Sequence, residues 1–307
     1  MSNIFQWTGR HDGDEIHHQR IFHIMNQSVS PEYVLIGFCS DEGVRRNKGR
    51  IGAAEAPNAI RKQLANLPVH QPMSIADRGD VICENGLLEQ AQQMLADQVA
   101  ESLAQGEKPI VLGGGHEVAY GSFSGLFQYL QTHEPEKNIG IINFDAHFDL
   151  REAERASSGT PFLQAAKTSI EHNKPFHYLC IGVAKHSNTQ VLFETAEQLN
   201  CEYIYDREVQ VAQLDSLVQK VQRFIDQVDY LYVTIDIDVF ASSIAPGVSA
   251  PAVKGIDLAV FDPLIQMIKN TGKIRVFDVA ECNPKFDIDH KTAKLAAYIV
   301  YQYLFNQ

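Results

Sequence analysis

Short apolar runs alternate along most of the chain with longer segments of helical spacing. Such runs predict buried strands, and apolar residues three or four positions apart predict amphipathic helices. We expect strands within 33–38, 80–83, 110–117, 139–151, 178–183, 203–205, 230–240 and 273–282. We expect helices at 57–64, 87–105, 118–131, 191–199, 214–228, 258–268 and 290–305, and loops at 40–50, 152–162 and 241–255. Alternating strands and helices indicate a parallel sheet covered on both faces, so the sequence predicts an α/β fold.

Three of the expected strands end in side chains that can bind metal ions. In an extended chain alternate side chains share a face, so Asp145, His147 and Asp149 should point the same way at the end of their strand. Open α/β sheets bind ligands at the carboxyl ends of their strands. The candidate ligands at the three strand ends are His116; Asp145, His147 and Asp149; Asp236 and Asp238.

Four carboxylates and two imidazoles that converge at one place require a counter-charge, because unpaired buried charge is unfavourable. These are too many ligands for one tetrahedral zinc ion, and they suit two divalent ions that share carboxylates and activate water for hydrolysis. Oxygen and imidazole ligands favour a harder ion such as manganese, although Mn, Fe, Co, Ni and Zn all stay open. An isolated Asp-x-Asp is more often a turn, so the prediction depends on the three strand ends together.

Composition narrows the class of protein. A chain of 307 residues is long enough for one large α/β domain, and we expect a single domain over 1–307. The formal net charge of −12 argues against a nucleic-acid or anionic-membrane partner. Five scattered cysteines without a Cys-x-x-Cys motif fit a reducing compartment, and no apolar run approaches the roughly 20 residues that span a bilayer. We therefore expect a cytoplasmic protein, and we also expect a homo-oligomer.

Five motifs in their chain order resemble the ureohydrolases, the arginase and agmatinase superfamily. They are Gly-Gly-Gly-His-Glu (113–117), Asp-Ala-His-Phe-Asp (145–149), Ser-Gly-Thr-Pro-Phe (158–162), Asp-Ile-Asp-Val-Phe (236–240) and Asp-Val-Ala-Glu-Cys-Asn-Pro (278–284). The resemblance covers nearly the whole chain. It implies a three-layer αβα arginase-like fold with a parallel sheet of about eight strands.

The resemblance also implies roles for individual residues. Two Mn²⁺ ions per subunit would be held by the six candidate ligands, with Asp145 and Asp236 shared between them and with a hydroxide between the ions as nucleophile. Asp149 would orient the hydroxide and accept its proton, and Glu281 would pair with the cationic carbon–nitrogen group under attack. One ion would take His116, Asp145, Asp149 and Asp236, and the other would take Asp145, His147, Asp236 and Asp238.

Ser158 departs from the arginase pattern, which has a histidine directly before the Gly-Thr-Pro-Phe segment. Serine does not titrate near neutral pH, so proton delivery to the leaving group must differ. The loop at 40–50 adds a second clue, because Arg45, Arg46 and Arg50 form a basic segment in an acidic protein. Arginine binds carboxylates with two hydrogen bonds, so the loop predicts an acidic amidine substrate.

Further segments resemble the formimidoylglutamase branch of the superfamily, in which serine at this position is usual. They include Trp-Thr-Gly-Arg (7–10), Glu-Gly-Val-Arg-Arg-Asn (42–47) and Gly-Arg-Ile-Gly-Ala-Ala (49–54). This resemblance implies hydrolysis of N-formimidoyl-L-glutamate to L-glutamate and formamide. Candidate substrate-binding residues are Arg45, Arg46, Asn47, Ser158 and Asn188.

Three alternatives stay open at this stage. A guanidino-acid hydrolase, similar to guanidinobutyrase or agmatinase, would use the same metals and release urea. A catalytically inactive relative would bind its ligand without turnover. A single-zinc deacylase of related fold would not need all six candidate ligands.

Overall fold

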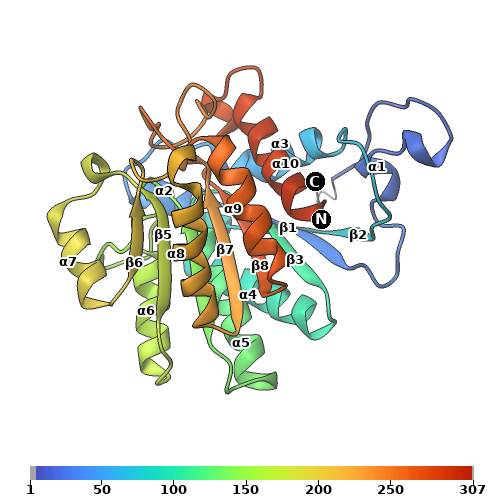
Figure 1. The fold of residues 1–307 in the computed structure, drawn as a ribbon. Helices are drawn as coiled ribbons and strands as arrows, with labels where there is room; N and C mark the ends of the chain where they lie inside the picture. The colour runs from blue at the N-terminus through green and yellow to red at the C-terminus, as the bar shows by residue number, and fades with distance from the viewer. Residues whose placement is uncertain (1–4, 306–307) are drawn as a thin grey trace.

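Eight strands form one parallel sheet in the described part of the chain, residues 5–305 of a computed structural model (Figure 1). The strands are β1 (Tyr33–Cys39), β2 (Ile75–Ile82), β3 (Lys108–Leu112), β4 (Ile139–Phe144), β5 (His177–Val183), β6 (Glu202–Tyr205), β7 (Tyr230–Asp236) and β8 (Ile274–Ala280). Their order is β2-β1-β3-β8-β7-β4-β5-β6, and every neighbouring pair is parallel. Parallel neighbours require long crossovers, and helices supply most of these connections.

Helices cover both faces of the sheet. The helices are α1 (Ile21–Ile24), α2 (Glu42–Arg46), α3 (Ala56–Leu64), α4 (Leu88–Ala104), α5 (Val118–His133), α6 (Pro161–Glu171), α7 (Gln190–Gln198), α8 (Leu214–Asp226), α9 (Leu258–Asn270) and α10 (Lys291–Leu304). One core packs α3, α8, α9 and α10 against the sheet, and the other packs α4, α5, α6 and α7 (Figure 1). The α/β fold class with a parallel sheet between two helical layers is therefore confirmed.

Alternate residues of the strands feed the two cores. Leu35 of β1 packs in the core of α3 and α10, and the next residue, Ile36, packs in the core of α4 and α5. In β4 the same division separates Ile141 from Ile142. Strands that are buried on both faces need apolar residues at every position, which explains the continuous apolar runs in the sequence.

Three elements differ from the sequence prediction. The expected loops at 152–162 and 40–50 contain parts of two helices, α6 and α2. Pro161 occupies the first turn of α6, where its missing N–H breaks no helical bond. Strand β2 starts five residues before the expected 80–83, because its charged residues Asp77 and Asp80 are satisfied by an ion pair that the apolar pattern does not reveal.

The central strand order brings the candidate residues together. Strands β3, β8, β7 and β4 are consecutive neighbours in the sheet, and their carboxyl ends lie along one edge. His116 follows β3, Glu281 follows β8, Asp236 ends β7 and Asp145 follows β4. Residues more than a hundred positions apart in the sequence therefore become neighbours at this edge.

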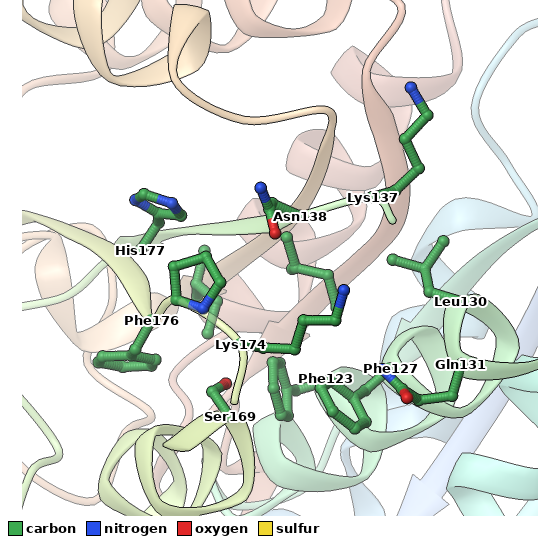
Figure 2. Close-up of a pocket in the computed structure, with 13 residues that line it drawn as sticks. Phe123, Phe127, Leu130, Gln131, Lys137, Asn138, Ser169, Lys174, Phe176 and His177 are labelled. Carbon is green, nitrogen blue, oxygen red and sulfur yellow. The ribbon is translucent and has the colours of Figure 1, made fainter. Parts of the chain in front are cut away.

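A small pocket lies at the amino-terminal ends of β4 and β5, on the side of the sheet opposite the candidate residues. Figure 2 shows Phe123, Phe127 and Phe176 with Lys174 and His177 around it. Its volume of about 10 Å³ is close to that of one water molecule, so the pocket is too small for an organic ligand.

Among residues 5–305, every helix is too short or too polar to span a bilayer.

A buried ion-pair cluster joins α3 to the edge strand β2. The guanidinium of Arg61 is fully buried, and its nitrogens lie 2.9 Å from Asp77 Oδ1 and 2.5 Å from Asp80 Oδ1. Trp7 Nε1 donates to the other oxygen of Asp77 at 2.8 Å. Loss of the cation would leave two carboxylates that are largely buried and unpaired.

We predict that Arg61→Leu lowers the free energy of unfolding by about 3–5 kcal/mol, the usual effect of removing one partner of a buried ion pair. Urea unfolding followed by circular dichroism measures this change. The exposed pair of Lys167 and Glu152 is the control, since Lys167→Leu should change stability by less than about 1 kcal/mol. Equal effects of the two substitutions would contradict the importance of burial.

Candidate active site

Two Asp side chains fold the chain tightly at the ends of β4 and β7. Asp145 Oδ1 accepts a hydrogen bond from the backbone N–H of His147 at 2.7 Å. Asp236 Oδ1 accepts from the N–H of Asp238 at 2.8 Å in the same way. An Asp that bonds the backbone two residues later is a standard turn device. The other oxygen of Asp145, Oδ2, accepts a hydrogen bond from Asn143 Nδ2 at 3.0 Å and also faces the site, 3.2 Å from His116 Nδ1.

Convergence of the three residues after β4 has a different origin from the expected one. The strand ends at Phe144, before Asp145, so the alternation of an extended chain does not apply. Asp149 instead reaches the site from a backbone with φ of +49°, in the left-handed region that few non-glycine residues adopt. The expectation of a shared strand face was therefore wrong, although the side chains do meet.

His116 is placed by the glycine turn after β3. A Cβ atom on Gly114 would lie 1.8 Å from the carbonyl oxygen of Ser40, so only glycine fits this close approach to β1. The N–H of Glu281 donates to the Gly114 carbonyl at 2.8 Å, and the N–H of His116 donates to Glu281 Oε1 at 2.9 Å. These bonds join the turns after β3 and β8.

The candidate ligands form two groups that share Asp145. Within each group one donor atom per residue lies within 4.8 Å of the others. The first group is His116, Asp145, Asp149 and Asp236, as expected, and the second is Asp145, His147 and Asp238. Asp236 was expected in both groups, but the observed geometry includes it only in the first.

Electrostatics at the first group require a cation. His116 Nδ1 lies 3.0–3.2 Å from oxygens of three carboxylates, yet it forms no hydrogen bond with acceptable geometry. Burial and the nearby carboxylates of Asp238 and Asp145 raise the pKa of Asp236 well above its usual value. A ring nitrogen and several carboxylates that surround one point without bonding one another fit a metal ion, and these donors suit a hard divalent ion.

A cavity of about 190 Å³ opens over these residues. Its floor includes Asp149, Asp236 and Asp238, and Glu281 lies in its wall. Glu281 Oε2 is buried without a hydrogen-bond partner, and burial together with the charge of Glu117 raises the pKa of Glu281 to about 8. A cationic group beside Glu281 would supply the missing counter-charge.

Three of the five expected substrate contacts line this cavity, namely Asn47, Ser158 and Asn188. Asn47 Nδ2 donates to Ser158 Oγ at 3.2 Å, which links the segment after α2 to the loop before α6. Asn188 is occupied otherwise, because its amide oxygen accepts from the N–H of Phe148 and its amide nitrogen donates to two backbone carbonyls. Its contacts therefore support the His147 turn.

Arg45 and Arg46 lie outside the cavity lining. Arg45 is exposed and pairs with Glu42 at 2.6 Å. Arg46 is buried, pairs with Glu42 at 2.9 Å and Glu89 at 2.5 Å, and donates to the carbonyl of Ala156 at 2.9 Å. Arg46 thus holds the 152–159 loop against α2 and α4, which is a role in cavity shape and not a contact with its interior.

Arg50, like Arg46, bonds another segment of the chain and does not line the cavity. Its side chain donates to the carbonyls of Val248 and Ser249 and stacks 4.2 Å from the ring centre of Phe286. Arg46 and Arg50 of the 40–50 segment, which predicted an acidic substrate, therefore bond the loops that surround the cavity.

Arg151 is the arginine that lines the cavity, although no motif in the sequence predicted a role for it. It stands two residues after Asp149, and its N–H donates to the carbonyl of Gly159 at 2.9 Å. Its guanidinium has no ion-pair partner among the described residues. The signal that could have found it is its position directly after the Asp-Ala-His-Phe-Asp motif, because a residue there must follow the turn into the same cavity.

Known proteins are similar to this chain over most of its length. A sequence profile of the Arginase family matches residues 31–305. The formimidoylglutamase of Aeromonas hydrophila is 48% identical over 303 residues, which cover 96% of each chain. That of Chromobacterium violaceum is 46% identical over 305 residues, with 98% of this chain and 97% of its own covered. The crystal structure of a single-residue variant of Trypanosoma cruzi formiminoglutamase with Mn²⁺ has a TM-score of 0.80 at 26% identity, and the match covers 91% of this chain and 94% of that one.

Because Asp145 is common to both ligand groups, we predict that chelator-treated protein binds about two Mn²⁺ per chain and that Asp145→Asn weakens both ions. Asp238→Asn should weaken only one, since this residue belongs to the second group alone. Equilibrium dialysis with metal analysis measures the occupancy. Asp229→Asn is a control just before β7, at the opposite edge of the sheet, and an unchanged pair of ions in Asp145→Asn would refute the shared position.

Proposed function

The chain belongs to the arginase family, and from this premise we propose that it hydrolyses N-formimidoyl-L-glutamate to L-glutamate and formamide. The observation that carries the proposal is the pairing of two chemistries in one cavity. Buried metal-type ligands and an unpaired Glu281 carboxylate form one part, and the free guanidinium of Arg151 forms another. A substrate with one cationic amidine end and carboxylates at the other complements both.

We propose that the metals are a pair of Mn²⁺ ions. The two donor groups around Asp145 fit them, and the related T. cruzi enzyme was crystallised with Mn²⁺. His116, Asp149 and Asp236 would complete one site, and His147 and Asp238 the other. When bound, such ions lower the pKa of a water so that hydroxide is available near neutral pH.

Glu281 would bind and orient the formimidoyl group. Its Oε1 is already held by the His116 N–H, so Oε2 is the atom left for an amidinium N–H. A charge-assisted bond between a carboxylate and an amidinium is about twice as strong as a neutral one, and it strengthens in a buried site. Because its pKa is raised, Glu281 without substrate resists ionisation, and the arriving cation favours its charged form.

Asp149 would take the proton released as the nucleophile attacks. It lines the cavity and also belongs to the first donor group, so one carboxylate faces both the metals and the substrate. Its position in the left-handed region fixes this dual orientation. Ser158, where arginases have histidine, offers only a hydroxyl, so proton delivery to the leaving group would depend on Asp149 or on water.

The carboxylates of the substrate would meet Arg151, with Asn47 and Ser158 beside it. Arginine's planar donors match a carboxylate, and the Asn47–Ser158 pair adds neutral donors on the same wall. Arg46 would not touch the substrate. It would bond the Ala156 carbonyl and so hold the loop that carries Ser158 in place. We therefore still propose an acidic substrate, with Arg151 in place of Arg45 and Arg46 as the partner of its carboxylates.

The remaining expectations stay predictions. They are a single domain over residues 1–307, a homo-oligomer and a cytoplasmic location.

With Mn²⁺ present, we expect formamide release from N-formimidoyl-L-glutamate and little turnover of 4-guanidinobutyrate, arginine or agmatine. Formamide and urea should both be quantified, since urea from guanidinobutyrate would instead favour a guanidino-acid hydrolase. Asp149→Ala should abolish turnover while it leaves the fold intact by circular dichroism. Failure to hydrolyse any of the four substrates in the Mn²⁺-loaded protein would favour a binding-only relative.

Arg151→Met should raise KM about 10- to 100-fold, because an arginine–carboxylate bond contributes about 1.5–3 kcal/mol. Arg45→Met is the matched control, since Arg45 is a neighbouring arginine outside the cavity, and it should change KM less than about twofold. Initial rates across substrate concentrations give both values. The reverse order of effects would return the substrate carboxylates to Arg45.

A further inference from the structure

The second ring nitrogen of His116 faces away from the metal ligands, into the sheet. His116 Nε2 lies 3.1 Å from Thr234 Oγ1, and both residues are fully buried. The ring is also held edge-on by Phe162, with 5.4 Å between ring centres. A histidine that offers Nδ1 to a cation must carry its proton on Nε2, so Thr234 Oγ1 is the acceptor for that proton.

Thr234 in turn stands beside a buried carboxylate. Thr234 of β7 and Asp278 of β8 are directly paired in the sheet register, and both are 0% exposed. Asp278 Oδ2 accepts from Ser122 Oγ at 2.6 Å and from Tyr232 OH at 2.7 Å. No lysine or arginine pairs with Asp278 among the described residues, so the ion-pair pattern gives no structural reason for a carboxylate here.

The hydrogen-bond directions follow from the chemistry of each group. A hydroxyl has one proton to donate, and an ionised carboxylate only accepts. Burial raises the pKa of Asp278, whereas the hydrogen bonds from Ser122 and Tyr232 oppose that shift. The second oxygen of Asp278, Oδ1, is buried without a hydrogen-bond partner and is the atom left for the Thr234 hydroxyl. If the Thr234 hydroxyl donates to Asp278, its oxygen is left to accept from His116 Nε2–H. The direction of the whole chain of bonds is then set by its carboxylate end.

We propose that Thr234 and Asp278 are positioning residues that keep the proton of His116 on Nε2 and so aim the Nδ1 lone pair at the first metal ion; this rests on the metal-dependent function proposed above.

The alternative tautomer explains why such a device is useful. In metal-free protein, three carboxylate oxygens lie 3.0–3.2 Å from Nδ1 and would attract a proton there. A proton on Nδ1 would occupy the position that the ion needs. An acceptor at Nε2, polarised by a carboxylate, favours the tautomer that leaves Nδ1 free.

The second donor group provides an internal control. It contains His147 and not His116, and no comparable hydroxyl–carboxylate pair contacts the far nitrogen of His147 among the hydrogen bonds of residues 5–305. The proposal therefore predicts an asymmetry. Loss of the Thr234 hydroxyl should weaken one ion and spare the other.

The test is a Mn²⁺ titration of chelator-treated protein, followed by calorimetry and by electron paramagnetic resonance. In Thr234→Val we expect one ion to bind about 10- to 100-fold more weakly, with the other within about threefold of the unsubstituted protein. Thr234→Ser should restore both affinities, because it returns the hydroxyl. Ser169→Ala, which removes a buried hydroxyl that bonds only the Ala165 carbonyl, should change neither.

A tautomer measurement on metal-free protein separates positioning from general destabilisation. In ¹⁵N-histidine spectra recorded at an alkaline pH at which the ring is neutral, His116, assigned by its loss in His116→Gln, should show a protonated Nε2 in the unsubstituted protein and in Thr234→Ser. In Thr234→Val the proton should shift toward Nδ1. If Thr234→Val does not fold, Asp278→Asn carries the same two measurements.

Two unchanged ion affinities in Thr234→Val, or an unchanged tautomer, would overturn the proposal. Equal weakening of both ions would also overturn it, since that indicates a loosened fold. Failure of the unsubstituted protein to bind Mn²⁺ would count instead against the proposed function, so the two failures are distinguishable.

Discussion

The constraint on which the rest of this structure depends is a cluster of carboxylates buried away from solvent. Four Asp carboxylates and Glu281 lie buried or nearly so at the carboxyl edge of the sheet, together with two imidazoles. Such a cluster is unfavourable unless cations complete it. The strand order makes the cluster possible, since β3, β8, β7 and β4 deliver their ends side by side. The surrounding hydrogen bonds, from the Asp145 and Asp236 turns to the contact of His116 with Thr234, hold the donors in place against their mutual repulsion.

Three buried or partly buried arginines in this acidic protein hold separate segments of the chain together. Arg46 and Arg50 join segments far apart in the sequence, and Arg61 joins α3 to the neighbouring strand β2, through carboxylates or backbone carbonyls. Arginine suits this use because its rigid group offers five donors and stays charged. Arg151 differs, since it faces the cavity with no ion-pair partner among the described residues. One arginine thus lines the cavity, while Arg46 and Arg50 hold the segments around it.

Much of the fold and of the metal-type cluster could be predicted from the sequence, because both depend on local patterns. Apolar runs revealed most of the strands, and the motifs around Asp145 and Asp236 marked the site. Elements held by tertiary contacts were missed in whole or in part. These are the first half of β2, whose aspartates are paired with Arg61, and α6, whose start lies in a polar loop. The substrate side was harder for the same reason. A guanidinium's partners cannot be read from spacing, so the packing was needed to show that Arg46 bonds the Ala156 carbonyl and that Arg151 lines the cavity.

Left-handed backbone at Asp149 and Glu281 has a consequence for how such an enzyme can change. Nine non-glycine residues of the described chain have positive φ, and four of them are asparagines, which tolerate this conformation well. Glu281 at the cavity does so less readily, at a strain of about 1–3 kcal/mol, and Asp149 still does so less readily than a glycine would. Random drift toward greater thermal robustness would favour glycine or asparagine at both places. Selection for turnover must therefore act continuously against that drift, and thermostable descendants that lost the reaction would be expected to reveal it first at these two positions.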